Sequence, residues 1–205
     1  MKWNESLKVK LSSYIIFGLF LILAVSSFLI ISTVTSQQEE LAYQQSIEMA
    51  KNHANQIDAD EKANKAIAQS IANSMAKYES GNRDEVSNIL KNLLVENPHL
   101  LGTYVGYEPN VFDGKDEEYA NTEIHDSTGR FIPYWNKLGG SMTVEPLVDY
   151  ESSEYYQLPK SSKADVITEP YLYEGTLLVS YVSPIINDDK FVGIEIGRAS
   201  CRERV

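Results

Sequence analysis

Three hydrophobic patterns follow one another along this chain, and each predicts a different kind of element. Residues 11–34 form an unbroken apolar run, residues 37–78 place apolar side chains three and four positions apart, and the chain after Pro98 changes to a strand-like period. These patterns are typical of a membrane span, an amphipathic helix and β-strands. The expected order is therefore a membrane helix, a long helix and a sheet.

The apolar run is long enough to cross a membrane. It reads LSSYIIFGLFLILAVSSFLIISTV, about 24 residues without a charge, and about 20 suffice for a transmembrane helix. A cleaved signal peptide has a shorter apolar region and a small-residue cleavage site, which this run lacks. Lysines precede the run and Glu39 and Glu40 follow it, so residues 1–10 are expected in the cytoplasm and the chain after the span outside the cell membrane.

Residues 35–80 are expected to form one stalk helix, because strong helix formers dominate and no proline or glycine interrupts 37–78. A seam recurs every seven residues, with a polar break at Glu61 and Asn64. Its apolar members are Tyr43, Ile47, Ala50, Ala54, Ile57, Ala68, Ile71, Met75 and Tyr78. Such a seam packs against its own domain or against the same helix of a second subunit, and a homodimer through the membrane-near half is compatible with both.

The remaining chain predicts helices packed on a sheet. A second helix is expected over 83–96, ending at Asn97 because the residue before a proline avoids the helical region. The expected strands cover 100–107, 129–136, 142–148, 165–173, 176–186 and 190–196, with a polar loop over 108–128 and a short helical piece at 155–160. Consecutive strands joined by short turns pair antiparallel, so the expected class is α+β with one antiparallel sheet.

Charge and cysteine content exclude several functions. The net charge of -11 makes nucleic acid a poor partner, because an acidic surface repels phosphates. The single cysteine, Cys201, stands in the last five residues, so the body of the protein has no thiol for a disulfide, a metal or a nucleophile. No cofactor is expected.

Catalytic and metal-binding patterns are weak. His53, His99 and His125 are scattered, and neither a Gly-x-Ser-x-Gly elbow nor a His-Glu-x-x-His helix is present. Asp113 and Asp116 lie in a polar loop that lacks the alternating oxygen ligands of a calcium loop, so a solvated loop is favoured over a cation site. No catalytic or metal-binding residues are expected.

Tyrosine is the unusual residue type, with 13 in the chain and most of them between Tyr104 and Tyr181. A tyrosine offers a flat apolar face and one hydroxyl, which suits a pocket for a small polar molecule, although core packing accounts for any single one.

Arg130 is a candidate for carboxylate recognition or for an ion pair with the acidic loop. In a strand over 129–136, Arg130 and Tyr134 share one face and Trp135 takes the other, so only one set can face a pocket. The candidate ligand-binding residues are Arg130, Tyr134, Trp135, Tyr155, Tyr156, Tyr171, Tyr173 and Tyr181.

Several stretches together resemble the double-Cache sensor domains of bacterial and archaeal chemoreceptors and sensor kinases. They are TYVGYEPNVFDG (103–114), GRFIPYWN (129–136), EPLVDYESSEYYQLP (145–159), ITEPYLYEG (167–175) and the closing TLLVSYVSPI and FVGIEIG, after a membrane span and a long helix. The resemblance covers roughly residues 12–197. It implies a membrane-distal, PAS-like Cache module over 81–197 that binds amino acids, amines, organic acids or other metabolites in a pocket over the sheet.

The resemblance also assigns roles to individual residues. Tyr171 matches a position whose ring borders the ligand, and Tyr155 and Tyr156 match a Trp-Tyr pair. Members that bind amino acids carry an arginine two residues before that pair and an aspartate two residues after the position of Tyr171. This chain has Ser153 and Tyr173 there, which argues against a standard α-amino acid as ligand.

The last residues differ in character from the rest. From Gly197 the chain reads GRASCRERV, abruptly basic, where the resembled family carries a strand and often a ligand-contacting aspartate. We expect residues 198–205 to be a non-native or truncated tail. A second sheet module, a second membrane helix and the cytoplasmic signalling domain of the family are expected to be missing from this chain.

The favoured function is extracytoplasmic sensing of a small molecule by a transmembrane methyl-accepting chemotaxis receptor. The ectodomain of a sensor histidine kinase or nucleotide cyclase is an alternative that the sequence does not separate from it. Two alternatives come from other classes: a membrane-tethered enzyme, and an adhesion or scaffold module. A saturable small ligand would distinguish a sensor from an adhesion module.

Overall fold

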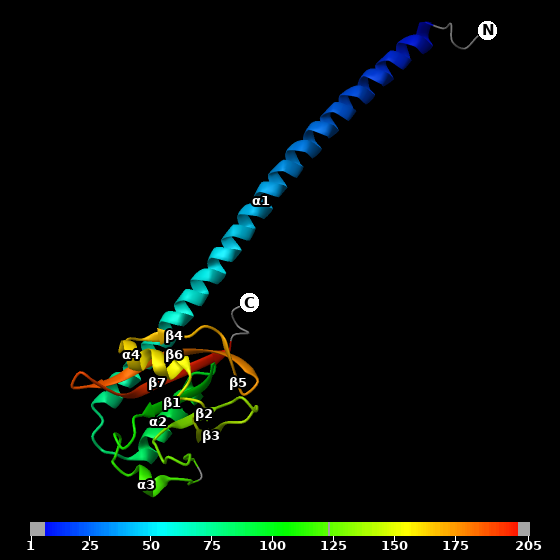
Figure 1. Cartoon of the computed structure of the whole chain (residues 1–205). Helices are drawn as coiled ribbons and strands as arrows, with labels where there is room; N and C mark the ends of the chain where they lie inside the picture. Colours follow the sequence, from blue (N-terminus) through cyan, green and yellow to red (C-terminus); the bar gives the residue numbers. More distant parts are fainter. Residues whose placement is uncertain (1–6, 123, 201–205) are drawn as a thin grey trace. The chain divides into compact units, whose positions relative to one another are not determined.

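The computed structural model describes residues 7–122 and 124–200. Residues 1–6 of the expected cytoplasmic segment and residues 201–205 of the expected tail, with Cys201, lie outside the described residues. The elements are α1 (Leu7–Ala76), α2 (Arg83–Glu96), β1 (Leu100–Tyr107), α3 (Asp116–Tyr119), β2 (Pro133–Asn136), β3 (Thr143–Pro146), α4 (Glu154–Ser162), β4 (Val166–Ile167), β5 (Tyr171–Tyr173), β6 (Thr176–Asn187) and β7 (Lys190–Ser200) (Figure 1). The chain divides into two compact units, Met1–Gln56 and Ile57–Val205.

The described part of the first unit is a single helical segment of α1, whose residues 11–34 carry apolar side chains all round. Phe17, Phe20 and Phe28 are 65%, 70% and 72% exposed. None of the most apolar 18-residue window, with a mean hydropathy of 2.7, is buried in protein. By length and composition this helix can cross a membrane, since a helix that is apolar on every side needs an apolar surrounding.

The second unit contains one antiparallel sheet. The strand order is β3-β2-β1-β7-β6-β4, and β5 also pairs with β6. The last strand of the chain, β7, thus lies between β1 and β6, where Figure 1 shows it in red between green and orange strands. The antiparallel sheet with helices confirms the predicted α+β class.

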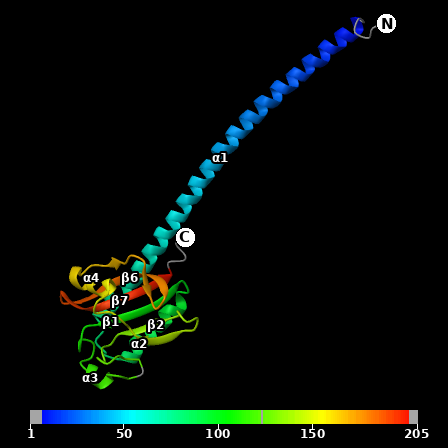
Figure 2. The ribbon, with the colours of Figure 1, turned by 45° about the vertical axis from the view of Figure 1, so that its right-hand side comes forward.

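Each face of this sheet carries its own hydrophobic core, because side chains along a strand alternate between the two faces. Tyr155 and Tyr156 of α4 belong to the first core, whereas Val86 of α2 and Met75 of α1 belong to the second. The first core contains Tyr104, Ile132, Tyr134, Leu147, Tyr150, Tyr155, Tyr156, Tyr173, Leu178, Val182, Ile194 and Ile196. The second contains Ala72, Met75, Val86, Leu90, Val105, Tyr107, Phe131 and Ile185. Thus α4 covers one face, and α2 with the C-terminal part of α1 covers the other (Figure 2).

The C-terminal part of α1 packs against its own domain. Asn64, Ala68, Ala72 and Met75 are its buried residues. The polar break in the seam is accommodated here, because the Asn64 Oδ1 lies 2.8 Å from the His99 Nε2 in a hydrogen bond. In this unit the seam therefore packs against its own domain, which is one of the two arrangements predicted from the sequence. The homodimer through the membrane-near half of the helix stays a prediction.

Three predicted strands are shorter than expected, and one of them is the stretch 142–148, of which β3 covers Thr143–Pro146. Only Pro133–Asn136 of the stretch 129–136 is a strand, because the chain turns at Gly129, whose φ is 66°. A Cβ on Gly129 would lie 1.9 Å from the Asp116 backbone oxygen, so only glycine fits this turn. The stretch 165–173 is divided into β4 and β5 by a segment containing Pro170, which has no N–H for the ladder.

Other boundaries agree more closely. The helix α2 covers Arg83–Glu96 as expected, with Asn82 as N-cap and Asn97 as C-cap, and β1 covers the predicted 100–107. The loop 108–128 contains the short helix α3, which was not expected.

The strand predicted over 190–196 extends to Ser200. Arg198, assigned by sequence to a tail outside the fold, therefore lies in β7 and is fully buried. A position in a strand does not establish whether residues 198–205 are native, so that part of the expectation stays a prediction.

Candidate ligand-binding site

Five tyrosines surround one place on the face of the sheet that α4 covers. They are Tyr104 of β1, Tyr134 of β2, Tyr155 of α4, and Tyr171 and Tyr173 of β5. We call this set the tyrosine cage. Tyr171 and Tyr173 are two residues apart on one strand, so both side chains point to the same face. Three strands and a helix thus contribute to one cluster.

The rings of the tyrosine cage contact one another in sequence. Ring centroids are 5.9 Å apart between Tyr171 and Tyr155, 5.9 Å between Tyr155 and Tyr104, 5.6 Å between Tyr104 and Tyr134, and 5.5 Å between Tyr134 and Tyr173. Three of the four contacts are edge-to-face and the Tyr155–Tyr171 pair is stacked. Such contacts hold aromatic rings at defined angles, so each ring positions the next.

The hydroxyls of the tyrosine cage are unequally satisfied. Tyr155 donates to the backbone oxygen of Val148, the backbone N–H of Val148 donates to the Tyr173 hydroxyl over 3.3 Å, and the Tyr171 hydroxyl lies 2.7 Å from the Ser180 Oγ. By contrast, the Tyr104 hydroxyl is buried without a hydrogen-bond partner among the described residues, and the Tyr134 hydroxyl has the Arg198 guanidinium close by, which opposes the rise of its pKa. A buried polar group without a partner costs stability, so the Tyr104 hydroxyl is a strained point of this core.

Residue 198 of β7 stands at the floor of the tyrosine cage. Its cross-strand neighbours are Gly102 on β1 and Ser180 on β6. A Cβ on Gly102 would lie 2.5 Å from the Tyr134 Cε2, so the glycine allows that ring to lie over the strand. With small residues on both sides, the side chain at position 198 decides how much of the space over the sheet is filled.

In this chain the Arg198 side chain fills that space. Its guanidinium carbon is 3.7 Å from the ring centroid of Tyr173, 4.6 Å from that of Tyr134, 4.8 Å from that of Tyr104, 5.0 Å from that of Tyr155 and 5.8 Å from that of Tyr171. Its three nitrogens make no hydrogen bond of good geometry in the described part of the chain, although the guanidinium is close enough to the Tyr134 and Tyr173 hydroxyls to oppose the rise of their pKa. The cage therefore encloses a cation mainly by aromatic rings.

An open hollow of about 280 Å³ borders the cage and includes Tyr155 and Tyr171 in its wall. Two exposed carboxylates, Glu154 and Glu169, also line it, and its lining has no basic residue. Acidic groups around an aromatic site favour positively charged molecules.

Burial keeps the phenols of the cage neutral. It raises the pKa of Tyr104, Tyr134, Tyr155 and Tyr173 above the usual tyrosine value, although the neighbouring Arg198 charge opposes the rise. Because that usual value is about 10, the rings carry no negative charge near neutral pH. They interact with a cation through their faces and hydroxyl dipoles.

Four of the eight predicted ligand-binding residues, Tyr134, Tyr155, Tyr171 and Tyr173, are brought together in the cage. Arg130 and Tyr156 form a separate buried pair beside it, in which the Arg130 Nη2 donates to the Tyr156 hydroxyl over 2.6 Å. Arg130 also donates twice to the backbone oxygen of Tyr107, over 2.8 and 3.0 Å. The guanidinium predicted to bind a ligand carboxylate is therefore largely engaged with protein groups.

The remaining two predicted residues, Trp135 and Tyr181, lie on the other face of the sheet, which α1 and α2 cover. The Trp135 Nε1 donates to the Ser87 Oγ of α2 over 3.0 Å. Tyr181 lines a different hollow of about 230 Å³, together with Ile57 of α1 and His99. The strand alternation that separates Tyr134 from Trp135 was foreseen from the sequence, and the structure places Tyr134 on the cage side.

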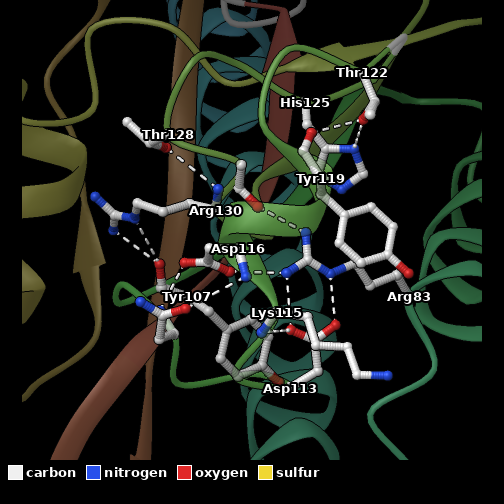
Figure 3. A network of polar contacts seen from close by, with 12 residues as sticks. Arg83, Tyr107, Asp113, Lys115, Asp116, Tyr119, Thr122, His125, Thr128 and Arg130 are labelled. Atoms are coloured by element: carbon white, nitrogen blue, oxygen red, sulfur yellow. Dashed lines mark hydrogen bonds and ion pairs between the residues drawn. The ribbon is translucent and has the colours of Figure 1, made fainter.

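Arg83 organises the acidic loop. Figure 3 shows this guanidinium between Asp113 and Asp116, with Tyr119 beside it. Arg83 reaches the two Asp113 oxygens over 2.7 and 2.8 Å, Asp116 Oδ1 over 2.8 Å and the Gly129 backbone oxygen over 2.7 Å. Arg83 holds the pKa of Asp113 below its usual value, against the effect of burial. Within 7–122 and 124–200 no cluster of three metal-ligating side chains occurs.

Sequence reasoning did not single out Tyr104, Gly102 or Arg198. Tyr104 lies in the stretch 103–114 and shares its strand face with Gly102, so alternation along β1 was the available signal. Arg198 was set aside with the tail, and only the register of β7 against β1 and β6 places it under the cage.

Comparisons with known proteins agree with this architecture. Residues 86–196 match the family model for the methyl-accepting chemotaxis protein-like, first PDC sensor domain. The Methyl-accepting chemotaxis protein TlpQ of Pseudomonas aeruginosa is 28% identical over 131 residues, which cover 55% of this chain and 18% of TlpQ.

Two solved structures show the same fold. The extracellular domain of mmHK1S-Z3, a protein described as a histidine kinase, is 60% identical with a TM-score of 0.76, and the match covers 80% of this chain and 60% of that one. Methyl-accepting Chemotaxis protein X is 26% identical with a TM-score of 0.65, covering 77% of this chain and 63% of the other. The matched relatives are thus sensory receptors, and this chain spans less than two thirds of each. The chain belongs to the methyl-accepting chemotaxis protein-like PDC sensor-domain family, whose model matches residues 86–196.

Proposed function

We propose that this chain is the ligand-binding, extracytoplasmic end of a double-Cache transmembrane receptor. The single observation that carries the proposal is the tyrosine cage, in which the buried Tyr104 hydroxyl has no hydrogen-bond partner among the described residues, and whose Tyr155 and Tyr171 line an open hollow of about 280 Å³. Polar atoms in a packed core are normally hydrogen-bonded within the protein. In a binding pocket, a polar atom that is unpaired in the free protein can bond to the ligand.

Signal transfer in this proposal runs along α1. The helix is continuous from Leu7 to Ala76, so it includes both the apolar segment and the four buried residues Asn64, Ala68, Ala72 and Met75. A ligand that binds one packing of this helix more tightly than another shifts the population toward it, by no more than the difference in affinity. A homodimer through the exposed seam residues Tyr43 and Ile47 would give the helix a partner near the membrane.

Two outputs compete. The family model and TlpQ support a methyl-accepting chemotaxis receptor, the function favoured from the sequence. The 60% identity to mmHK1S-Z3 supports a sensor histidine kinase. The coding sequence downstream of residue 197 in the source genome would decide between them. A long methylated coiled coil favours the receptor, and a histidine-bearing helix followed by an ATP-binding domain favours the kinase.

A thermal-shift screen of the full chain in lipid nanodiscs tests the sensor proposal itself. The chain as written and an Arg198→Ala variant, whose cage is not filled by arginine, are melted with panels of amines, amino acids, organic acids and sugars. At 100 times Kd a ligand adds about 2.7 kcal/mol, which raises Tm by roughly 5–10 °C for a chain of this size. No saturable response in either chain would contradict a sensor and favour an adhesion module.

A further inference from the structure

A carboxyl group without a partner lies under the last turns of α1. Glu195 is fully buried in β7, and neither of its carboxylate oxygens has a hydrogen-bond partner among the described residues. Its cross-strand neighbours are Val105 of β1 and Ser183 of β6, and Val105 belongs to the core that α1 and α2 form on the sheet. Directly opposed side chains share a face. Glu195 therefore points toward these two helices and away from the tyrosine cage.

The end of α1 is attached on both sides of the strand that carries this carboxyl group. On the β1 side, the Tyr107 hydroxyl donates a hydrogen bond to the Met75 backbone oxygen over 3.3 Å. On the β6 side, Asp165 accepts one hydrogen bond from Gln69 of α1 and another from Ser183 over 2.8 Å. Because β7 lies between β1 and β6, this part of α1 passes over β7.

Small residues form the contact between α1 and β7. Between Asn64 and Met75, the buried residues of α1 are Ala68 and Ala72. On β7, Gly193 and Gly197 lie two positions before and after Glu195, so all three positions face the same way. Over residues 193–197, the single side chain that β7 places under the helix is thus a carboxyl group.

The surroundings of Glu195 do not offset a negative charge. The Ser183 hydroxyl donates its hydrogen to Asp165, so this hydrogen is not available to the neighbouring carboxyl group. The titratable side chains that are buried or half-buried on this side of the sheet are Glu61 and Lys65 of α1, Arg83 of α2, Tyr107 of β1, Tyr181 of β6 and Asp165 before β4. Lys65 pairs with Asp165, and Arg83 pairs with the acidic loop. Burial alone raises the pKa of Glu195, with no contribution from these groups.

We propose that Glu195 is a proton-dependent latch that holds the C-terminal part of α1 on the sheet. While the carboxyl group keeps its proton, α1 stays docked. When the group ionises, its charge requires water, which reaches it once Ala68 and Ala72 move away from β7. The latch is built from residues before position 198. In the proposed receptor, pH would be a second input to the helix that a ligand moves; this consequence rests on the proposed function, whereas the latch itself does not.

The docking equilibrium of α1 should therefore depend on pH with a defined slope. In the docked state the pKa of Glu195 is raised, whereas the hydrated carboxyl of the undocked state titrates near the usual 4.5. Docking is fully favoured below the lower of these two values. As the pH rises toward the higher one, the ratio of undocked to docked protein should increase about tenfold per pH unit, because docking takes up one proton.

Distances between spin labels, measured by electron spin resonance on the full chain in nanodiscs, test the latch. The labels are attached to Ala66→Cys on the exposed side of α1 and to Lys190→Cys at the exposed start of β7, with Cys201→Ser to remove the natural thiol. An excess of unlabelled chain restricts the measured distances to single chains. From about pH 5 to pH 9 we expect a second, longer distance to gain population with the slope given above, and to disappear when the pH is lowered again.

Matched variants separate the latch from other effects of pH. Glu195→Gln carries a neutral amide of the same shape, so its label distance should stay constant, and Glu195→Ala replaces it if the amide variant does not fold. Glu96→Gln, which alters an exposed carboxyl group, should behave as the original chain. A second label pair, at Ser161→Cys of α4 and Lys190→Cys, does not include α1 and should keep one distance throughout.

Three outcomes would overturn the latch. The first is an unchanged α1 distance in the original chain from about pH 5 to pH 9. The second is the same pH-dependent change in the variants that lack the Glu195 carboxyl group, because another group would then cause it. The third is a simultaneous change of both label pairs, which would show unfolding of the whole unit. None of them concerns ligand binding by the tyrosine cage, which the thermal-shift screen measures separately.

Discussion

At the scale of single residues, Glu195 is the least expected feature of the fold. It is fully buried in β7 on the face that α1 and α2 cover, beside Val105 of β1 and Ser183 of β6. Neither of its carboxylate oxygens has a hydrogen-bond partner among the described residues. Burial alone raises its pKa well above 4.5. An unpaired carboxyl in such a place is held in its neutral form, since ionisation would bury a charge.

The raised pKa of Glu195 predicts a pH dependence of stability. In the unfolded chain Glu195 ionises near pH 4.5, but in the folded protein only at a higher pH. Its favourable contribution is therefore complete below the unfolded pKa and is lost as the pH rises toward the folded pKa, by up to about 1.4 kcal/mol per pH unit. Urea unfolding across this range should show a Glu195→Gln variant gaining on the original chain as the pH rises.

The exposed Glu96 provides the matched control, because Glu96→Gln should follow the original chain at every pH. If Glu195→Gln and the original chain change in parallel with pH, Glu195 is not neutral in the folded state.

At the scale of elements, one arginine connects the start of α2 with the acidic loop. Arg83 is 4% exposed, pairs with Asp113 and Asp116, binds the Gly129 backbone oxygen, and its guanidinium carbon lies 4.0 Å from the Tyr119 ring centroid. The loop thus has a charged centre of its own. The spacing of Asp113 and Asp116 reflects this shared guanidinium.

Removing this guanidinium should destabilise the fold strongly. Arg83→Met leaves two buried carboxylates unpaired, which typically costs about 3–5 kcal/mol. It also removes the main cause of the lowered Asp113 pKa, whose stabilising contribution is present above the unfolded pKa and lost as the pH falls through the folded one. The free energy of unfolding in urea at pH 7 measures the loss.

Arg83→Lys keeps the charge but not the forked geometry, so an intermediate loss is expected. A loss below about 1 kcal/mol for Arg83→Met would show that the network contributes little more than surface ion pairs do.

At the scale of the whole molecule, the features predicted correctly from the sequence are those that depend on the periodicity of apolar residues. The apolar run, the bounds of α2 and β1, and the antiparallel class all follow from spacing and from proline positions. The interrupted strands were missed because close packing at Gly129 and the position of Pro170 outweigh the local strand pattern.

The candidate site was predicted in part for a similar reason. Tyrosine content and strand alternation indicate which side chains share a face, and four cage members were named in advance. The pairing of β7 with β1 and β6 depends on long-range register, which no local pattern contains, so Gly102 and Arg198 were found only in the structure. Arg130 was assigned to the ligand because the sequence does not show that the Tyr107 backbone oxygen accepts its hydrogen bonds.

The most direct measurement is an experimental structure of the full chain prepared with a small molecule that raises its Tm in the thermal-shift screen. We expect this molecule in the tyrosine cage or in the hollow beside Tyr155 and Tyr171, in contact with at least one of the cage rings. A structure in which the rings pack on one another, with the molecule bound elsewhere, would show that the cage is a packed core and contradict a ligand site.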